Sequence, residues 1–262
     1  MHYEEAGEGD ALLLVHGSLC DHRAWRRAAA KLAERYRVIV PDLPGAGASE
    51  KPTRYSFTRE ALAETLCDLL AGVGAHRAHV AGHALGGLLA LTMAADHPES
   101  VDRIVAVNAV AFRVEYPFRL RVPLVPVIGP VAFKQVFGRQ NFHGYFRGDV
   151  FAGGFAYDRA LVDAWFDQFD PPEARECAWQ TWQRSVVDVS ALGPKLSKVR
   201  APTAVLWGDR DRHFPVYLAQ RLAHEIPDAR VETIPGAGHC PPLEQPDATA
   251  EAILRHLARV AR

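Results

Sequence analysis

Short runs of apolar residues alternate along the chain with longer segments in which apolar residues recur at helical spacing. Several of the runs end at glycine, proline or aspartate, and most are more continuous than the alternating pattern of strands with one solvent-exposed face. They predict six strands, of which the first is expected to be buried on both faces, at 11–17, 37–42, 77–83, 102–110, 201–209 and 229–235. The segments between them predict helices at 25–35, 57–74, 85–98, 216–225 and 247–261. This alternation predicts an α/β fold with a mostly parallel, doubly wound sheet covered by helices on both faces.

The alternation is interrupted between residues 112 and 194. No obvious apolar strand occurs in this segment, which contains most of the chain's Phe, Tyr and Trp residues. Because strands are predicted on both sides of it, we expect residues 1–111 and 195–262 to form one core and residues 112–194 to form a helical lid. Most of the aromatic side chains are expected to build the lid's own small core, and some are expected to close an apolar pocket over the sheet.

The composition agrees with a globular protein that binds a small, apolar partner. Of the 262 residues, 48% are hydrophobic and 23% are charged, and the formal net charge is -1, so nucleic acid is not expected as a partner. No apolar run is long enough to cross a bilayer, and the first residues lack a signal-peptide pattern; we therefore expect a cytoplasmic protein without a membrane partner. Four cysteines lack metal-binding or redox spacing and are expected to be unpaired: Cys20, Cys67, Cys177 and Cys240.

The residues that follow the predicted strands carry the candidate chemistry, because ligands of parallel α/β sheets bind at the carboxyl ends of the strands. Four such ends contain polar residues or glycines: 16–18, 82–86, 208–211 and 236–239. The second has the frame of a nucleophile elbow, a sharp strand-to-helix turn that raises one side chain above the sheet. Gly82 and Gly86 flank the turn, where only small residues avoid collision, but the central residue is Ala84.

These segments resemble the α/β-hydrolase family, and the resemblance covers nearly the whole chain. The matching pieces are LLLVHGS, PDLPGAGASEKP, VAGHALGG, GDRDRHFP and GAGHCPPLEQP, in the family's order. The resemblance implies that Ala84 occupies the nucleophile position, that Asp211 is the acid and that His239 is the general base. It also implies an oxyanion hole built from the backbone N–H of Leu85 and one from Ser18 or Leu19. No cofactor is required by this chemistry.

Other polar residues have structural interpretations that compete with functional ones. Asp209 competes with Asp211 for the acid position, and the family spacing favours Asp211. His16 is expected to hold loops together, and His83 to pack beneath the elbow. Three further histidines show no metal spacing and are expected to be exposed: His22, His143 and His213. The loop with Gly45, Gly47 and Ser49 lacks a phosphate-binding pattern and is expected to be a tight turn that shapes the pocket. Three lid arginines could bind a carboxylate or simply be solvated: Arg139, Arg147 and Arg184.

Alanine at the elbow has three explanations, because a methyl group cannot attack a carbonyl carbon. The explanation we favour is that a serine was replaced deliberately to inactivate the enzyme. The chain could instead be a non-catalytic relative that binds a small molecule, or an enzyme that uses His239 as a base for lyase, cyclase or cofactor-free oxygenase chemistry. The sequence therefore predicts a hydrolase scaffold for an ester, lactone or thioester of a small apolar substrate, with a carbon–carbon bond hydrolase as a further alternative.

Overall fold

A seven-stranded sheet forms the centre of the computed structural model, which describes residues 1–112, 138–187, 189 and 192–258. The strand order is β1-β3-β2-β4-β5-β6-β7, and all neighbouring strands are parallel except β1 and β3. The strands are β1 (Tyr3–Ala6), β2 (Ala11–Val15), β3 (Arg37–Pro41), β4 (Ala78–His83), β5 (Val101–Val107), β6 (Thr203–Gly208) and β7 (Ala229–Ile234). The six predicted strands and the mostly parallel sheet are confirmed.

The antiparallel strand β1 was not predicted from the sequence. Its four residues, YEEA, are all exposed, so they carry neither an apolar run nor an alternating pattern. The strand pairs with β3 at the edge of the sheet, where Tyr3 lies opposite Pro41. An edge strand of this kind is defined by its backbone pairing and not by burial of side chains.

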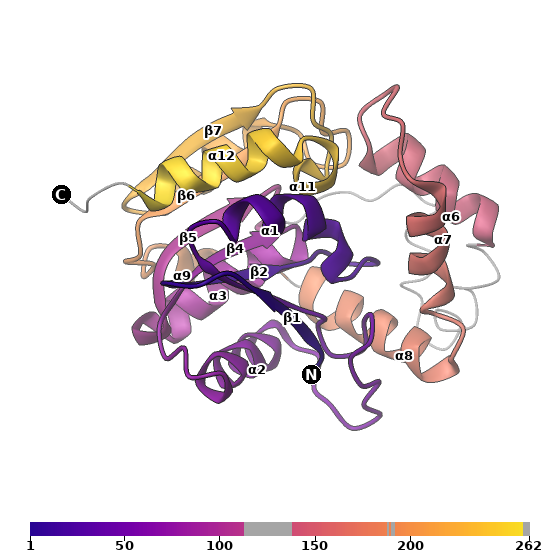
Figure 1. The fold of residues 1–262 in the computed structure, drawn as a ribbon, viewed down its shortest axis with the longest axis horizontal. Coiled ribbons are helices and arrows are strands. Elements are labelled where there is room, and N and C mark those ends of the chain that lie inside the picture. The colour runs from indigo at the N-terminus through magenta and orange to yellow at the C-terminus, as the bar shows by residue number, and fades with distance from the viewer. Residues whose placement is uncertain (113–137, 188, 190–191, 259–262) are drawn as a thin grey trace.

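Helices cover both faces of the sheet, as Figure 1 shows. One face packs against α1 (Arg26–Leu32) and α12 (Pro246–Leu257), and the other packs against α2 (Arg59–Gly72), α3 (Leu85–Asp96) and α10 (Tyr217–Glu225). Trp25 anchors the first face because its indole is fully buried and donates to the Val15 carbonyl. Short helices complete the core: η1 (His22–Trp25), η2 (Pro98–Ser100), α9 (Gly193–Leu196) and α11 (Pro241–Glu244).

The chain between β5 and β6 contributes helices beside the sheet in Figure 1. They are α6 (Arg139–Tyr145), η4 (Phe146–Val150), α7 (Arg159–Asp167), α8 (Pro172–Thr181) and η5 (Trp182–Val187). Aromatic side chains of this segment form a separate cluster that includes Phe142, Phe146 and Trp165. The same cluster contains Cys20 and Cys240, from the loops that follow β2 and β7. Part of the expected lid, residues 113–137, lies outside the described residues.

The cysteines were expected to be unpaired, and no segment was expected to cross a membrane. All four cysteines are free thiols. Among the described residues, no helix combines the length and the apolar character that a membrane span requires.

Candidate active site

The elbow between β4 and α3 consists of the single residue Ala84. Its backbone angles, φ 50° and ψ -108°, are rare for a residue with a side chain and cost about 1–3 kcal/mol. The end of β5 and the segment after it hold this conformation: the Ala84 N–H donates to the Val107 carbonyl at 2.9 Å, and the Ala84 carbonyl accepts from the Val110 N–H at 3.1 Å. The structure therefore raises the Cβ of residue 84 above the sheet in the geometry of a nucleophile elbow.

The glycines around the elbow are required by close backbone packing. A Cβ on Gly82 would overlap the Gly86 carbonyl, and a Cβ on Gly86 would overlap the carbonyl of Val15 in β2. Gly17 packs against the elbow, and a Cβ there would lie only 3.2 Å from the Ala84 Cβ. The loop after β2 and the start of α3 can meet over the sheet only because all three positions lack a side chain.

The residues expected to be acid and base meet beside the elbow. Asp211 lies in the turn after β6, and His239 lies in the loop after β7. The His239 Nδ1 is 2.9 Å from the Asp211 Oδ2, and both side chains are buried. The competing carboxylate, Asp209, is directed elsewhere and accepts from the Gly236 N–H at 2.8 Å. The structure thus brings Asp211, and not Asp209, into contact with His239.

The Asp211 carboxylate is held by three further donors. Its Oδ1 accepts from the N–H groups of His213 and Phe214 at 2.7 and 2.8 Å, and its Oδ2 accepts from the Asn108 amide. Burial alone would raise the pKa of Asp211, but the His239 ring and these donors outweigh it and hold the pKa below its usual value. Asn108, fully buried just after β5, also accepts from the Gly208 N–H. Sequence reasoning missed this residue, because no motif marks it.

Replacing Asp211 by asparagine should lower stability in a pH-dependent way. Because the pKa of Asp211 lies below its ordinary value of 3.8 in the folded chain, the stabilisation is present above about pH 4 and is lost as the pH falls through the folded value. We expect the free energy of unfolding of Asp211→Asn to be about 1–3 kcal/mol lower than that of the parent at pH 7. This difference should shrink below pH 4. Urea unfolding at several pH values measures this, and a difference independent of pH would contradict it.

Glu244 anchors the loop that carries His239. This buried carboxylate accepts from three backbone N–H groups, those of Ala152, Gly238 and Cys240, at 2.6, 3.0 and 2.9 Å. Burial raises the pKa of Glu244, and the three amides oppose that rise. The His239 N–H donates to the Val150 carbonyl, so the loop is also tied to η4. Sequence reasoning missed Glu244 because no motif marks a carboxylate that folds back onto the backbone of its own loop and of the distant Ala152.

Truncation of Glu244 should destabilise the protein far more than truncation of a solvated glutamate. Glu244→Ala leaves three buried N–H groups without their acceptor, which we expect to cost about 2–4 kcal/mol of unfolding free energy. Glu251→Ala is the matched control, because the exposed Glu251 forms only a surface ion pair with Lys31 and should change stability little. Equal losses in urea unfolding would contradict the anchoring role.

The residues whose amides are expected to form the oxyanion hole line the same pocket. Leu85 is the first residue of α3, so its N–H has no acceptor within the helix and lies at the positive end of the helix dipole. Ser18 and Leu19 follow the His-Gly turn after β2, and Leu19 has a left-handed φ of 64°. All three residues line one pocket of the cleft.

The cleft consists of two adjoining pockets. The elbow pocket contains Ala84 and His239, and the loop pocket contains Leu85 and the loop after β3. Ser18, Cys20 and Trp182 line both. The elbow pocket is otherwise lined by His83, Val110, Tyr145, Phe146, Val150, Trp165, Val186, His213, Phe214 and Cys240. No Asp, Glu, Lys or Arg is among the described residues that line either pocket.

Two further histidines of the elbow pocket are neutral at physiological pH. Burial, reinforced by the neighbouring His239, lowers the pKa of both His83 and His213 to about 3. The His83 Nε2 lies 2.8 Å from the His239 carbonyl, and the ring lines the elbow pocket, so His83 does not pack beneath the elbow as expected. His213 packs edge-on to the His239 ring, with centroids 4.9 Å apart.

Three expectations about side chains outside the triad were wrong. His143 is buried and bonded to Asp163, while His22 and His213 are partly buried, so none of them is simply solvated. Distant segments fold over these rings, which no local spacing reveals. For the three arginines of residues 112–194 the sequence left two roles open, and none of them is among the described linings of the cleft: Arg139 pairs with Asp163 and Asp167, Arg184 donates to the Ser56 carbonyl, and Arg147 is exposed.

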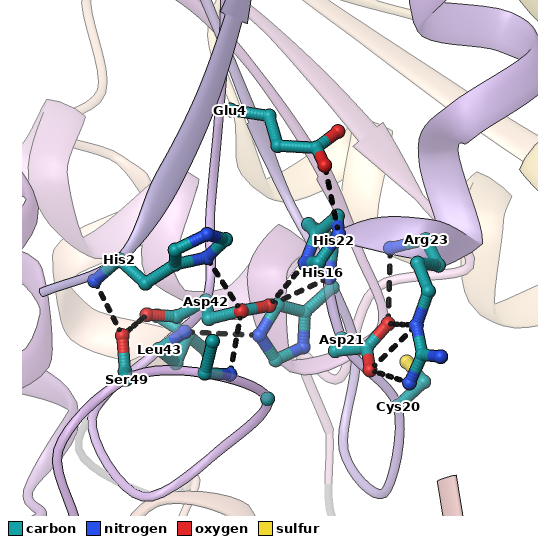
Figure 2. Close-up of polar contacts among 12 residues, drawn as sticks. His2, Glu4, His16, Cys20, Asp21, His22, Arg23, Asp42, Leu43 and Ser49 are labelled. Carbon is teal, nitrogen blue, oxygen red and sulfur yellow. Dashed lines mark hydrogen bonds and ion pairs between the residues drawn. The ribbon is translucent and has the colours of Figure 1, made fainter. Parts of the chain in front are cut away.

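Two loop expectations agree with the structure. His16 bridges two loops, since its Nδ1 lies 2.7 Å from the Gly17 carbonyl and its Nε2 accepts from the Leu43 N–H (Figure 2). The loop after β3 is a tight turn in which Gly45 and Gly47 have left-handed φ angles of 88° and 48°. Gly45 lines the loop pocket, and a Cβ on Gly47 would overlap the Asp42 carboxylate.

A family model described as the alpha/beta hydrolase family matches residues 12–252. The chain therefore belongs to the α/β-hydrolase family. Among similar proteins, a magnesium-chelatase 30 kDa subunit of Rhodobacter capsulatus is 31% identical over 88% of this chain and 81% of its own length. Lipase 1 of Psychrobacter immobilis is 29% identical, with 96% and 78% covered. A 2-hydroxy-6-oxo-6-phenylhexa-2,4-dienoate hydrolase of Burkholderia cepacia is 25% identical, with 98% and 91% covered.

Solved structures of hydrolases have the same fold. A bacterial membrane phospholipase A is 30% identical and superposes with a TM-score of 0.81, covering 97% of this chain and 81% of that one. A thermophilic esterase from Thermogutta terrifontis is 26% identical with a TM-score of 0.78, covering 98% and 92%. Proteins similar to this chain thus include a lipase, an esterase and a hydrolase of a dienoate.

Proposed function

We propose that this scaffold is that of a carboxylic ester, lactone or thioester hydrolase whose active form carries serine at position 84. One observation carries the proposal: the Cβ of Ala84, held in elbow geometry, lines the same pocket as a histidine bonded to a buried aspartate. With alanine at this position, the chain lacks the nucleophile and forms no acyl-enzyme.

The geometry supports a role for each neighbouring group in the reaction. A serine Oγ on residue 84 would attack the carbonyl carbon while His239 takes the hydroxyl proton, and Asp211 would stabilise the resulting imidazolium. The N–H of Leu85 and that of Ser18 or Leu19 would hold the oxyanion. His239 would then return the proton to the leaving alcohol or thiol, and water would release the acid by the same steps.

The pocket lining favours a substrate that is uncharged near the scissile bond. Apart from His239 when it holds the proton, the described residues of the elbow pocket include no ionised side chain, because His83 and His213 are neutral. Aromatic residues from 112–194, among them Phe146, Trp165 and Trp182, contribute to the wall. We propose that this segment acts as the lid of the core formed by 1–111 and 195–262, and that it selects apolar substrates.

Covalent labelling tests the proposal directly. Ala84→Ser should react with a fluorophosphonate at residue 84, whereas the parent chain and Ala84→Ser/His239→Ala should not, as measured by intact-mass and peptide mass spectrometry. Labelling of the parent chain at another residue, or no labelling of Ala84→Ser, would contradict the proposal.

A carbon–carbon bond hydrolase is the second candidate, because one similar protein is named a 2-hydroxy-6-oxo-6-phenylhexa-2,4-dienoate hydrolase. This reaction begins at a vinylogous diketone, so the two candidates differ in substrate and not in the residues that position it. Assaying Ala84→Ser with such a diketone beside simple esters separates them. Turnover of the diketone alone would favour the second candidate.

A further inference from the structure

Two histidines and an aspartate converge at the edge of the sheet, outside both pockets of the cleft. Asp42 directly follows β3, and its side chain is fully buried. The His2 Nδ1 lies 2.9 Å from the Asp42 Oδ2, and the His22 Nδ1 lies 2.8 Å from the Asp42 Oδ1, as Figure 2 shows. One ligand atom from each of the three residues lies within 4.8 Å of those of the other two. The three segments that contribute them are far apart in the sequence.

We propose that His2, His22 and Asp42 form a binding site for a divalent transition-metal ion of the zinc class. Two imidazole nitrogens and a carboxylate oxygen are the donor set that zinc takes with three protein ligands, and water completes the coordination. In the metal-bound form, one ion takes the place of the protons that the two Nδ1 atoms direct toward the carboxylate, and each displaced proton moves to the Nε2 of its own ring or is released to solvent. Asp42 compensates one of the two positive charges of the ion, and Glu4, beside His22, supplies a second negative charge near the site.

The partners of His22 support a ligand role. Its Nε2, on the far side of the ring from Asp42, lies 3.3 Å from the Glu4 Oε1. A histidine that binds metal through one nitrogen usually donates the other N–H to a carboxylate, which fixes the tautomer and the orientation of the ring. Glu4 is thus placed as a positioning residue that would leave the His22 Nδ1 free to bind the ion.

The other two ligands are also held from behind. The Asp42 carboxylate accepts from the backbone N–H groups of His22 and Ala48, both at 2.9 Å. The backbone N–H of His2 donates to the Ser49 Oγ at 2.8 Å, and that hydroxyl donates to the Asp42 carbonyl. Arg23, which Figure 2 shows beside the site, is engaged by Asp21 through three side-chain contacts and leaves Asp42 to the histidines.

An ion can reach the site from solvent on the side of His2. The His2 side chain is 37% exposed and that of His22 is 15% exposed, whereas Asp42 is completely covered. The exposed side leaves room for the water ligand of a three-residue site. Metal binding would join the residue before β1 to the loops after β2 and β3, so we expect it to stabilise the edge of the sheet.

Titration of the full chain, purified without a polyhistidine tag, tests the proposal. We expect the parent to bind about one Zn²⁺ by calorimetry, to develop visible Co²⁺ absorption bands and to unfold at a higher temperature with Zn²⁺. His2→Gln retains a hydrogen-bond donor for Asp42 but loses the imidazole, so it should weaken Zn²⁺ binding on the order of 100-fold. Glu4→Gln should weaken it about tenfold.

His97→Gln is the matched control, because His97 is 33% exposed and lies near one carboxylate, Glu99, at 3.9 Å. It should bind Zn²⁺ as the parent does. The proposal is overturned if the parent binds no Zn²⁺, or if His2→Gln binds it as tightly as His97→Gln does. Either result would leave the three residues as a hydrogen-bonded clamp. The test uses His2→Gln and not His22→Gln, because His2 is the more exposed of the two histidines. The glutamine of His2→Gln can still donate a hydrogen bond to Asp42, so this variant is expected to fold.

Discussion

Replacing Ala84 by serine is expected to create hydrolysis of activated esters, with kcat/KM on the order of 10⁴-fold or more above that of the parent chain. Loss of the nucleophile from a serine triad removes most of its rate, and the remaining groups act only through binding and oxyanion stabilisation. Here His239 is already bonded to Asp211, and the elbow already holds residue 84 at φ 50°. The substitution adds one oxygen atom and requires no rearrangement of the backbone.

The measurement is initial rates with p-nitrophenyl esters of short and medium acyl chains. Ala46→Ser is the matched control, because it adds the same hydroxyl to the loop pocket but away from the elbow. Adding His239→Ala to Ala84→Ser should return the rate to that of the parent. If Ala84→Ser folds normally and is no faster than Ala46→Ser on any ester, the serine-hydrolase proposal fails. Activity already present in the parent and lost in His239→Ala would instead favour chemistry in which the histidine acts as a base.

Replacing Gly82 by alanine is expected to remove about 3 kcal/mol or more of the free energy of unfolding. The added methyl would overlap the Gly86 carbonyl and the start of α3, which are backbone atoms that cannot turn aside as a flexible side chain can. Gly82 does not have a left-handed φ, so the cost is steric and not conformational. Relief would require α3 to move away from β4, and the elbow would be lost with it.

Gly144→Ala is the control for this experiment. Gly144 lies in α6, and apart from its chain neighbours and the backbone of its own helix, no heavy atom of the described residues lies within 4 Å of a Cβ built there. Because alanine favours helix more than glycine does, this variant should be unchanged or more stable by up to about 1 kcal/mol. Urea unfolding of both variants measures the difference. A Gly82→Ala protein as stable as Gly144→Ala would show that the turn tolerates a side chain and is not as tightly packed as the structure indicates.

Local patterns in the sequence were sufficient to predict the core of the fold. The strands β2, β4, β5 and β6 are mostly buried, so their apolar runs are continuous and unmistakable. The elbow could also be predicted, because a strand, one residue and a helix are contiguous, and the required glycines at 82 and 86 stand at fixed distances from residue 84. The exposed strand β1 has no such pattern and was missed.

The sequence by itself determined the α/β class and the elbow frame, because each of these depends on residues close together in the chain, whereas the order of the candidate triad came from the family resemblance. Only the tertiary structure decided that Asp211 contacts His239 while Asp209 does not, and that Asn108 and Glu244 support them. It also brought His2, His22 and Asp42 together. The physical reason is that parallel pairing aligns the carboxyl ends of strands that are distant in the sequence. Contacts between the loops at these ends depend on how the loops fold, which no local pattern of apolar and polar residues predicts.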